Sequence, residues 1–301
     1  MDVTGRSNYN SKKAFEENFG PAYYSFNRGK VHYVVLDDVF FTGKEYSSIG
    51  YLDEIQLNWL EQDLSLVPEG STVVVALHIP TYSREARRGE FAKEEINKVL
   101  QNRRILYKML ESYNAHILSG HEHYNENYIL GNRLFEHVHA ALCGIFWQAP
   151  YNSDGTPLGY GVYEFDGADV KWYYKAAGKD KRVQFNAYTA GADKHKPDAI
   201  VANVWNYDPE WKVFWYEDDV RMGEMKQYTG WDPAIVDYVE KNRSNFRYKY
   251  VGAGPVEHLF YAEPVNKNAK IKIEAVDRFN NVYASESLIP TIIGQETKES
   301  E

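Results

Sequence analysis

The sequence predicts a layered α/β domain followed by a small all-β, sandwich-like domain. Three observations support this fold class. Strand-like and helix-like segments alternate in the first part of the chain, as in layered α/β proteins. From Tyr128 onward short strands separated by turn signals dominate. A stretch rich in Gly, Lys and Asp lies between the two predicted domains and is typical of a linker. We therefore expect one domain over 1–181, a linker over 182–197 and a second domain over 198–301.

Apolar runs and helix-like periodicity define the elements of the first half. Strands are predicted at 31–36, which ends in Asp37 and Asp38, and at 72–77. The second run is almost entirely apolar and β-branched, which indicates a strand buried on both faces. Apolar residues recur at helical spacing over 52–66 and 92–113. A further short buried strand is predicted at 115–118, which completes the alternating order.

The second half is predicted to be mostly strands. One helix is expected at 232–241, and the polar tail 295–301 is expected to be disordered. The predicted strands are 128–130, 134–141, 161–165, 170–174, 200–205, 212–216, 258–262 and 270–276.

Composition excludes several classes of function. The 301 residues carry a formal net charge of −9, so we expect no binding to nucleic acid. Cys143 is the only cysteine, which excludes an internal disulfide and a cysteine-based zinc site. The sequence contains no run of about 20 apolar residues, so no membrane span is predicted. No signal-peptide segment opens the sequence, so the compartment is left open, and export of the complete protein is one alternative.

Three histidines follow predicted strands. His78 ends the strand at 72–77, and His121 and His123 follow the strand at 115–118 through Gly120. Ligands of α/β sheets gather beyond the carboxyl ends of strands. Residues i and i+2 of an extended chain point the same way, so two imidazoles could each bind one of two neighbouring metal ions. The alternative is that all three are structural. The histidines expected to face the core or the sheet are His32, His116, His137 and His139.

The ordered motifs resemble those of calcineurin-like metallophosphoesterases. Gly120-His-Glu-His123 is similar to the family's closing Gly-His-x-His motif, and Leu77-His-Ile-Pro80 to the single-His motif before it. Residues 19–37 and 50–64 resemble the segments that lie between the family's Gly-Asn-His-Asp motif and that single histidine. Gly155-Thr-Pro-Leu-Gly-Tyr160 resembles a bacterial branch that carries a C-terminal β domain. The second half resembles that domain at 203–205, 217–219 and 277–281.

The resemblance implies a metal-dependent phosphoesterase that uses two divalent ions of the Mn, Zn or Fe type to hydrolyse phosphate esters. On this basis His78 and His121 would bind one ion and His123 the other. Tyr82 and Asp154 would lie near the substrate. The first domain would then be the C-terminal part of a metallophosphoesterase-like domain.

None of three carboxylate-bearing motifs of the family, Asp-x-His, Gly-Asp-x-x-Asp and Gly-Asn-His-Asp, occurs ahead of the single-His motif in this sequence. By the resemblance they supply the bridging carboxylate, an Asn ligand and the general acid, which would lie upstream of this chain. Neighbouring cations repel, so two ions need a bridging negative charge. We therefore expect a piece of a longer enzyme that is inactive alone and holds at most one weakly bound ion. It would self-associate through the sheet face left open.

Two other readings of the sequence belong to different functional classes. The second domain could bind glycans or cell-envelope partners through a surface of exposed tryptophans. The chain could also be a non-catalytic scaffold. The tryptophans considered for such a surface are Trp205, Trp211, Trp215 and Trp231.

Overall fold

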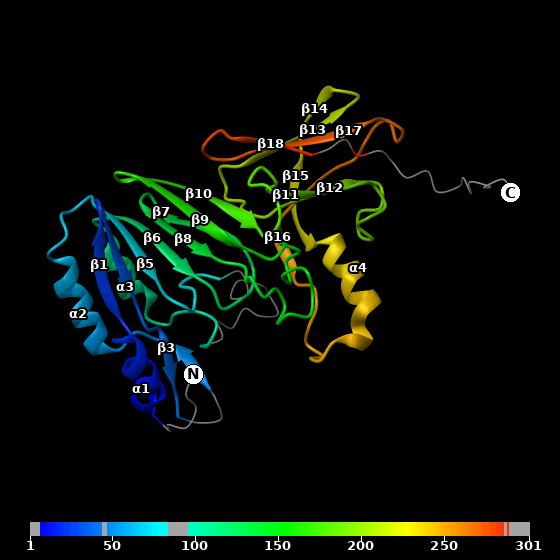
Figure 1. The fold of residues 1–301 in the computed structure, drawn as a ribbon. Coiled ribbons are helices and arrows are strands. Elements are labelled where there is room, and N and C mark those ends of the chain that lie inside the picture. Colours follow the sequence, from blue (N-terminus) through cyan, green and yellow to red (C-terminus); the bar gives the residue numbers. More distant parts are fainter. Residues whose placement is uncertain (1–6, 44–46, 84–95, 286–287, 289–301) are drawn as a thin grey trace. The chain divides into compact units, whose positions relative to one another are not determined.

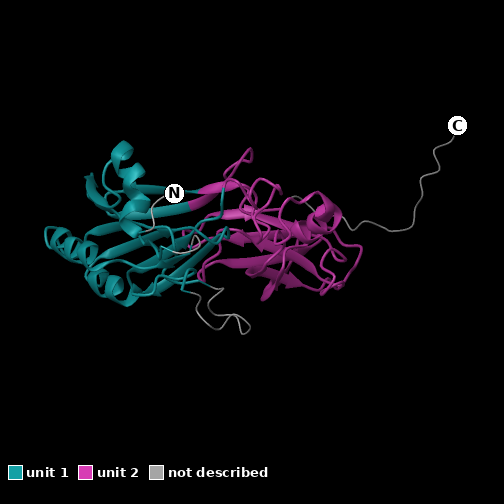
Figure 2. Cartoon of the chain, turned by 90° about the horizontal axis from the view of Figure 1, so that it is seen from below, with its two compact units in different colours: residues 1–141, 161–172 teal, residues 142–160, 173–301 magenta. Residues whose placement is uncertain are grey.

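The computed structural model describes residues 7–43, 47–83, 96–285 and 288, and its contacts divide the chain into two units (Figures 1 and 2). Unit 1 comprises Met1–Ala141 and Gly161–Trp172, and unit 2 comprises Leu142–Tyr160 and Tyr173–Glu301. This division differs from the expected boundary at 181. The expected linker 182–197 also contains a paired strand, because β11 (Phe185–Tyr188) lies beside β12 in a sheet.

Unit 1 is built on a six-stranded sheet in the order β1-β2-β5-β6-β8-β7 (Figure 1). The four inner strands run parallel, and the two edge strands are antiparallel to their neighbours. The strands are β1 (Tyr24–Arg28), β2 (Val31–Val35), β5 (Thr72–Ala76), β6 (Asn114–Ser119), β8 (Leu134–Val138) and β7 (Glu126–Gly131). The α/β character and the strands predicted at 31–36, 72–77 and 115–118 are confirmed.

Two helices of unit 1 share one core with the inner strands. Buried residues at alternate strand positions, such as Val75 and Ile117, belong to the same apolar cluster as residues of α2 (Glu54–Leu64) and α3 (Arg103–Leu110). The helix predicted over 92–113 is therefore shorter than expected: residues 96–98 form a turn, and 92–95 lie outside the described residues. The remaining elements are α1 (Asn8–Phe19), β3 (Val39–Phe41) and β4 (Ser48–Gly50).

Helix α1 was not predicted from the sequence. It begins after Ser7, whose side chain accepts a hydrogen bond from the backbone N–H of Asn10 and so satisfies a donor at the helix start. No apolar periodicity marks this segment, and only Ser11 of the helix is buried. The helix therefore depends on its cap and local propensity more than on burial.

A hairpin of β9 (Gly159–Asp166) and β10 (Asp169–Ala176) contributes residues to both units. Within unit 1, Tyr33 packs edge-on against Phe165 at 5.8 Å between ring centroids. The hydroxyl of Thr72 donates to the carbonyl of Ala168 at 2.8 Å. These contacts place the hairpin residues on the sheet face opposite α2 and α3.

Unit 2 contains two four-stranded sheets, in the orders β11-β12-β16-β15 and β14-β13-β17-β18. One apolar cluster includes residues of both sheets, among them Val204, Val213 and Ile273. The unit also contains α4 (Pro233–Asn242), which lies where the one helix was expected, a 3₁₀ helix (Arg243–Asn245) and residues 142–160. The other strands are β12 (Ile200–Val204), β13 (Lys212–Glu217), β14 (Val220–Glu224), β15 (Lys226–Trp231), β16 (Pro255–Ala262), β17 (Ile271–Val276) and β18 (Val282–Ala284). No helix in the described part of the chain is long and apolar enough to cross a membrane.

Truncating a side chain in the core of unit 1 should lower stability far more than truncating the same side chain on the surface. Ile117 has no exposed surface, so Ile117→Ala should lower the free energy of unfolding by about 2–5 kcal/mol. Ile105 of α3 is 45% exposed and provides the matched control, with an expected change of about 0.5 kcal/mol or less. Urea unfolding measures both, and equal losses would contradict this assignment of the core.

Candidate metal centre

The parallel strands β5 and β6 bring two of the predicted histidines into contact. Pairing continues past the strand ends, because the backbone N–H of Gly120 donates to the carbonyl of His78 at 3.1 Å. His121 Nδ1 then lies 3.1 Å from His78 Nε2, and the two rings meet edge-on with centroids 5.0 Å apart. One imidazole therefore donates a hydrogen bond to the other at this end of the sheet.

The backbone around these histidines is not extended. His121 and His123 have φ angles of 70° and 57°, in the left-handed region that few residues other than glycine adopt. The argument that i and i+2 share a direction along a strand is therefore wrong for this segment. Gly120 itself does not lie in that region, and a side chain there would meet nothing within 4 Å. Left-handed non-glycine residues persist only where their surroundings enforce them, and they cluster at functional sites.

A buried carboxylate fixes the backbone at His78. Asp38 follows β2, is 1% exposed, and accepts hydrogen bonds from the backbone N–H groups of His78 and Ile79, each at 2.9 Å. Burial raises the pKa of Asp38 to about 7, while the two backbone donors act to lower it. Asp38 thus orients the main chain that carries the first histidine.

A second buried carboxylate joins the two histidine-bearing segments. Glu136 on β8 has no exposed surface, and its Oε1 accepts from the backbone N–H of Thr81 at 2.7 Å and from Ser119 Oγ at 2.9 Å. Its Oε2 accepts from the backbone N–H of Tyr82 at 2.8 Å and from the Thr81 hydroxyl. Burial raises the pKa of Glu136 to about 7 against the effect of these donors. Glu136 thereby links the turn after His78 to the end of β6.

The surroundings of His78 and His121 favour the neutral form of the imidazole, which is the form that binds metal ions. Burial lowers the pKa of His121 to about 4, and the neighbouring His78 and Lys98 lower it further. Burial, and then the charge of His123, lowers the pKa of His78. His123 contributes to the lowered pKa of both His78 and His121, so the third predicted histidine lies near this pair.

These residues fit a metal ion in part. Neutral imidazoles suit Zn, Fe or Ni ions, and the His78 and His121 nitrogens face each other. Among the residues that the structure describes, however, no group of three or more His, Cys, Asp or Glu side chains is arranged to hold an ion. Asp38 and Glu136 use their oxygens on backbone donors, and neither supplies the missing negative charge.

The two predicted substrate residues differ in position. Tyr82 belongs to the turn fastened by Glu136, and its ring packs edge-on against Tyr128 with centroids 4.7 Å apart. Asp154 lies in unit 2, has no exposed surface, and accepts hydrogen bonds from the backbone and the hydroxyl of Thr156. Its carboxylate therefore serves a buried turn, and this burial does not favour the substrate role predicted for it.

The other histidines of unit 1 contact sheet neighbours and core groups, as predicted. His32 contacts Asp63 Oδ2 at 2.8 Å, and His116 stacks on His137 with centroids 5.4 Å apart. His139 contacts the Tyr163 hydroxyl at 2.8 Å.

Comparison with known proteins shows what this chain resembles. Residues 136–283 match the family described as the C terminal of calcineurin-like phosphoesterase. The match supports the resemblance to calcineurin-like phosphoesterases that the sequence motifs indicate. Purple acid phosphatase 13 of Arabidopsis thaliana is 32% identical over 116 residues, which are 36% of this calcineurin-like chain and 19% of that protein.

Two solved structures resemble this calcineurin-like chain at low sequence identity. The 5'-nucleotidase from Candida albicans SC5314 is 13% identical with a TM-score of 0.32, over 54% of this chain and 28% of that one. A dimetal phosphatase from Danio rerio is 14% identical with a TM-score of 0.30, over 66% and 62% of the two chains.

Replacing Glu136 by glutamine should destabilise unit 1. Both oxygens accept from backbone N–H groups, so the amide of Glu136→Gln must leave one buried donor unsatisfied, at about 1–3 kcal/mol. Urea unfolding at neutral pH measures the loss. Glu164→Gln, at an exposed position of β9, is the matched control and should change stability by about 0.5 kcal/mol or less. Equal stability of the two variants would show that Glu136 does not fasten the turn.

His121 should remain uncharged well below the ordinary histidine pKa of 6.5. In the unfolded chain it binds a proton near pH 6.5, whereas in the folded protein it does so only near pH 4. Its contribution to the free energy of unfolding is therefore fully present above pH 6.5 and is lost as the pH falls toward 4. Proton NMR of the His121 ring, assigned with His121→Asn, measures the titration. A midpoint near 6.5 would contradict the burial described.

Proposed function

We propose that this chain contributes imidazole ligands to the metal site of a phosphoesterase that hydrolyses phosphate esters. The observation that carries the proposal is the contact between the rings of His78 and His121, which two adjacent parallel strands bring together. Partial burial lowers the pKa of both rings. The resemblance to calcineurin-like phosphoesterases adds the reaction class. His123 is the third proposed ligand, and its left-handed backbone and coupling to His78 support this role.

Each residue has a defined part in this proposal. His78 and His121 would hold one side of an ion, with Asp38 and Glu136 keeping their backbones in place. Tyr82 would border the substrate from the turn held by Glu136. When bound, divalent metal supplies charge neutralisation and a nucleophilic water at neutral pH.

The 301 residues alone are proposed to have little or no activity. Ahead of His78 their sequence lacks the family motifs that carry the bridging carboxylate, the Asn ligand and the general acid. General acid–base help alone is worth about 10²–10⁴-fold in rate. We propose that the complete enzyme supplies these groups and uses two divalent ions, and that this chain alone binds at most one ion weakly.

The tryptophan surface considered for a binding module does not form as expected. Trp205, Trp211 and Trp215 are 0%, 5% and 8% exposed and belong to the interior of unit 2. Only Trp231 of the four is exposed, at 41%. The four tryptophans therefore do not form a stacked surface, and they give no support to the hypothesis that the chain is a binding module and not an enzyme.

Binding of Zn²⁺ by this chain should depend on His78. Calorimetric titration with Zn²⁺ should detect weak binding that His78→Ala reduces at least about tenfold, because one of few imidazole donors is lost. His116→Ala, which removes a buried histidine away from the pair, is the control and should bind Zn²⁺ as before.

Turnover of p-nitrophenyl phosphate and of its bis ester, with Mn²⁺, Zn²⁺ or Ni²⁺, should be negligible for the 301 residues. A longer protein that also carries the three missing motifs should show metal-dependent turnover. Turnover by the 301 residues that equals that of the longer protein would overturn the proposed inactivity. Absence of turnover in both would overturn the proposed phosphoesterase activity on these substrates.

A further inference from the structure

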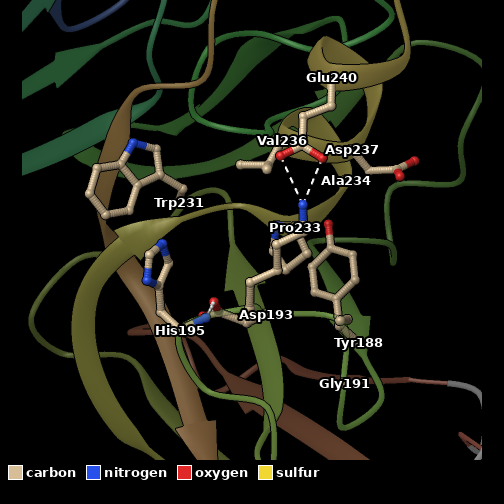
Figure 3. A pocket seen from close by; sticks show the side chains of 12 residues that line it. Tyr188, Gly191, Asp193, His195, Trp231, Pro233, Ala234, Val236, Asp237 and Glu240 are labelled. Atoms are coloured by element: carbon tan, nitrogen blue, oxygen red, sulfur yellow. Dashed lines mark hydrogen bonds and ion pairs between the residues drawn. The ribbon is translucent and has the colours of Figure 1, made fainter.

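Unit 2 contains a cavity that the proposed phosphoesterase site does not use. It has a volume of about 470 Å³ and is lined by the end of β11 and the residues that follow it, by Trp231 at the end of β15, and by residues along α4. This volume lies within the range of about 300–1,000 Å³ that small-molecule sites occupy. Figure 3 shows the rings of Trp231 and His195 next to each other at one side and Glu240 on helix α4.

Trp231 offers an aromatic platform inside this cavity. Its side chain is 41% exposed, whereas the three other tryptophans named above are buried in unit 2. His195 extends the platform, with its ring centroid 5.5 Å from Trp231 and the planes tilted by 36°. A large exposed ring at the wall of a cavity is positioned to stack against a ligand.

The charges of the cavity are already compensated. Glu240 accepts from Lys194 Nζ at 2.7 and 2.8 Å, and Asp237 accepts from Lys241 Nζ at 2.8 Å. Asp193, which is 5% exposed, accepts from the Tyr228 hydroxyl at 2.7 Å and from the backbone N–H of His195 at 2.8 Å.

This pattern discriminates between classes of ligand. An anion would meet carboxylates and the negative face of the indole. A cation would have to displace lysines from their carboxylate partners. A neutral polyhydroxylated ring is not repelled by the carboxylates and does not have to displace a lysine. Its C–H face can stack on Trp231 while its hydroxyl groups exchange hydrogen bonds with Lys194 and Glu240.

We propose that this cavity binds a neutral sugar ring stacked on Trp231. The site is separate from the proposed metal ligands, all of which belong to unit 1. It would let unit 2 hold a glycan whether or not the chain is catalytically active.

Isothermal titration calorimetry with maltotriose, cellotriose and tri-N-acetylchitotriose tests the proposal. At least one of the three should bind the wild-type protein in the millimolar range or better. Trp231→Ala should weaken that binding at least about tenfold, because the stacking ring is lost. Trp231→Phe, which keeps a smaller aromatic face, should weaken it less.

Trp147→Ala is the matched control, since Trp147 is 77% exposed in unit 2 and does not line the cavity. It should bind as the wild type does, and the thermal unfolding of both alanine variants should match the wild type. The proposal is overturned if none of the trisaccharides binds, or if Trp147→Ala rather than Trp231→Ala abolishes binding. It is also overturned if choline or inorganic phosphate, but no sugar, binds in a Trp231-dependent manner.

Discussion

The hydrogen-bonding demand of two buried carboxylates shapes one end of the sheet in unit 1. A carboxylate without water contact needs several donors, because its burial is otherwise very unfavourable. Asp38 and Glu136 obtain theirs from the backbone just after β5 and from Ser119 at the end of β6. The interior of the unit therefore dictates the path of the turns that follow these strands.

This constraint explains why His78 and His121 meet at the end of the sheet. Residues Ala76 and Leu118 are register partners in the parallel pair, so β5 and β6 end at the same level. The turn after β5 is then held by carboxylates that are not themselves available to a ligand. Preorganised donors of this kind reduce the free-energy cost of binding, because the protein does not have to rearrange around the ion.

Much of this arrangement follows from local sequence pattern. The all-apolar run that forms β5 and the short run that forms β6 predicted adjacent buried strands, and the histidines after them predicted a common edge. Asp38 was visible only as a polar residue at a strand end. Glu136 had one available signal: it is a charged residue inside the otherwise apolar strand β8, and a charge there requires buried partners.

Features that depend on tertiary context were not predictable in this way. The φ angles of His121 and His123 depend on contacts around the turn and not on strand periodicity. The sequence also could not distinguish inward from outward tryptophans in unit 2. Trp215 on β13 is buried against the second sheet, whereas Trp231 at the end of β15 is exposed.

The left-handed backbone at His121 and His123 affects how these positions tolerate substitution. Asparagine and glycine adopt this conformation far more readily than alanine or a β-branched residue does. An alanine there would combine loss of the imidazole with a change in backbone preference, and the two effects could not be separated. Asparagine keeps the turn accessible, and valine or isoleucine should be the least compatible replacements. Natural variation at both positions should therefore be narrower than a surface loop would suggest, even in relatives that have lost the metal.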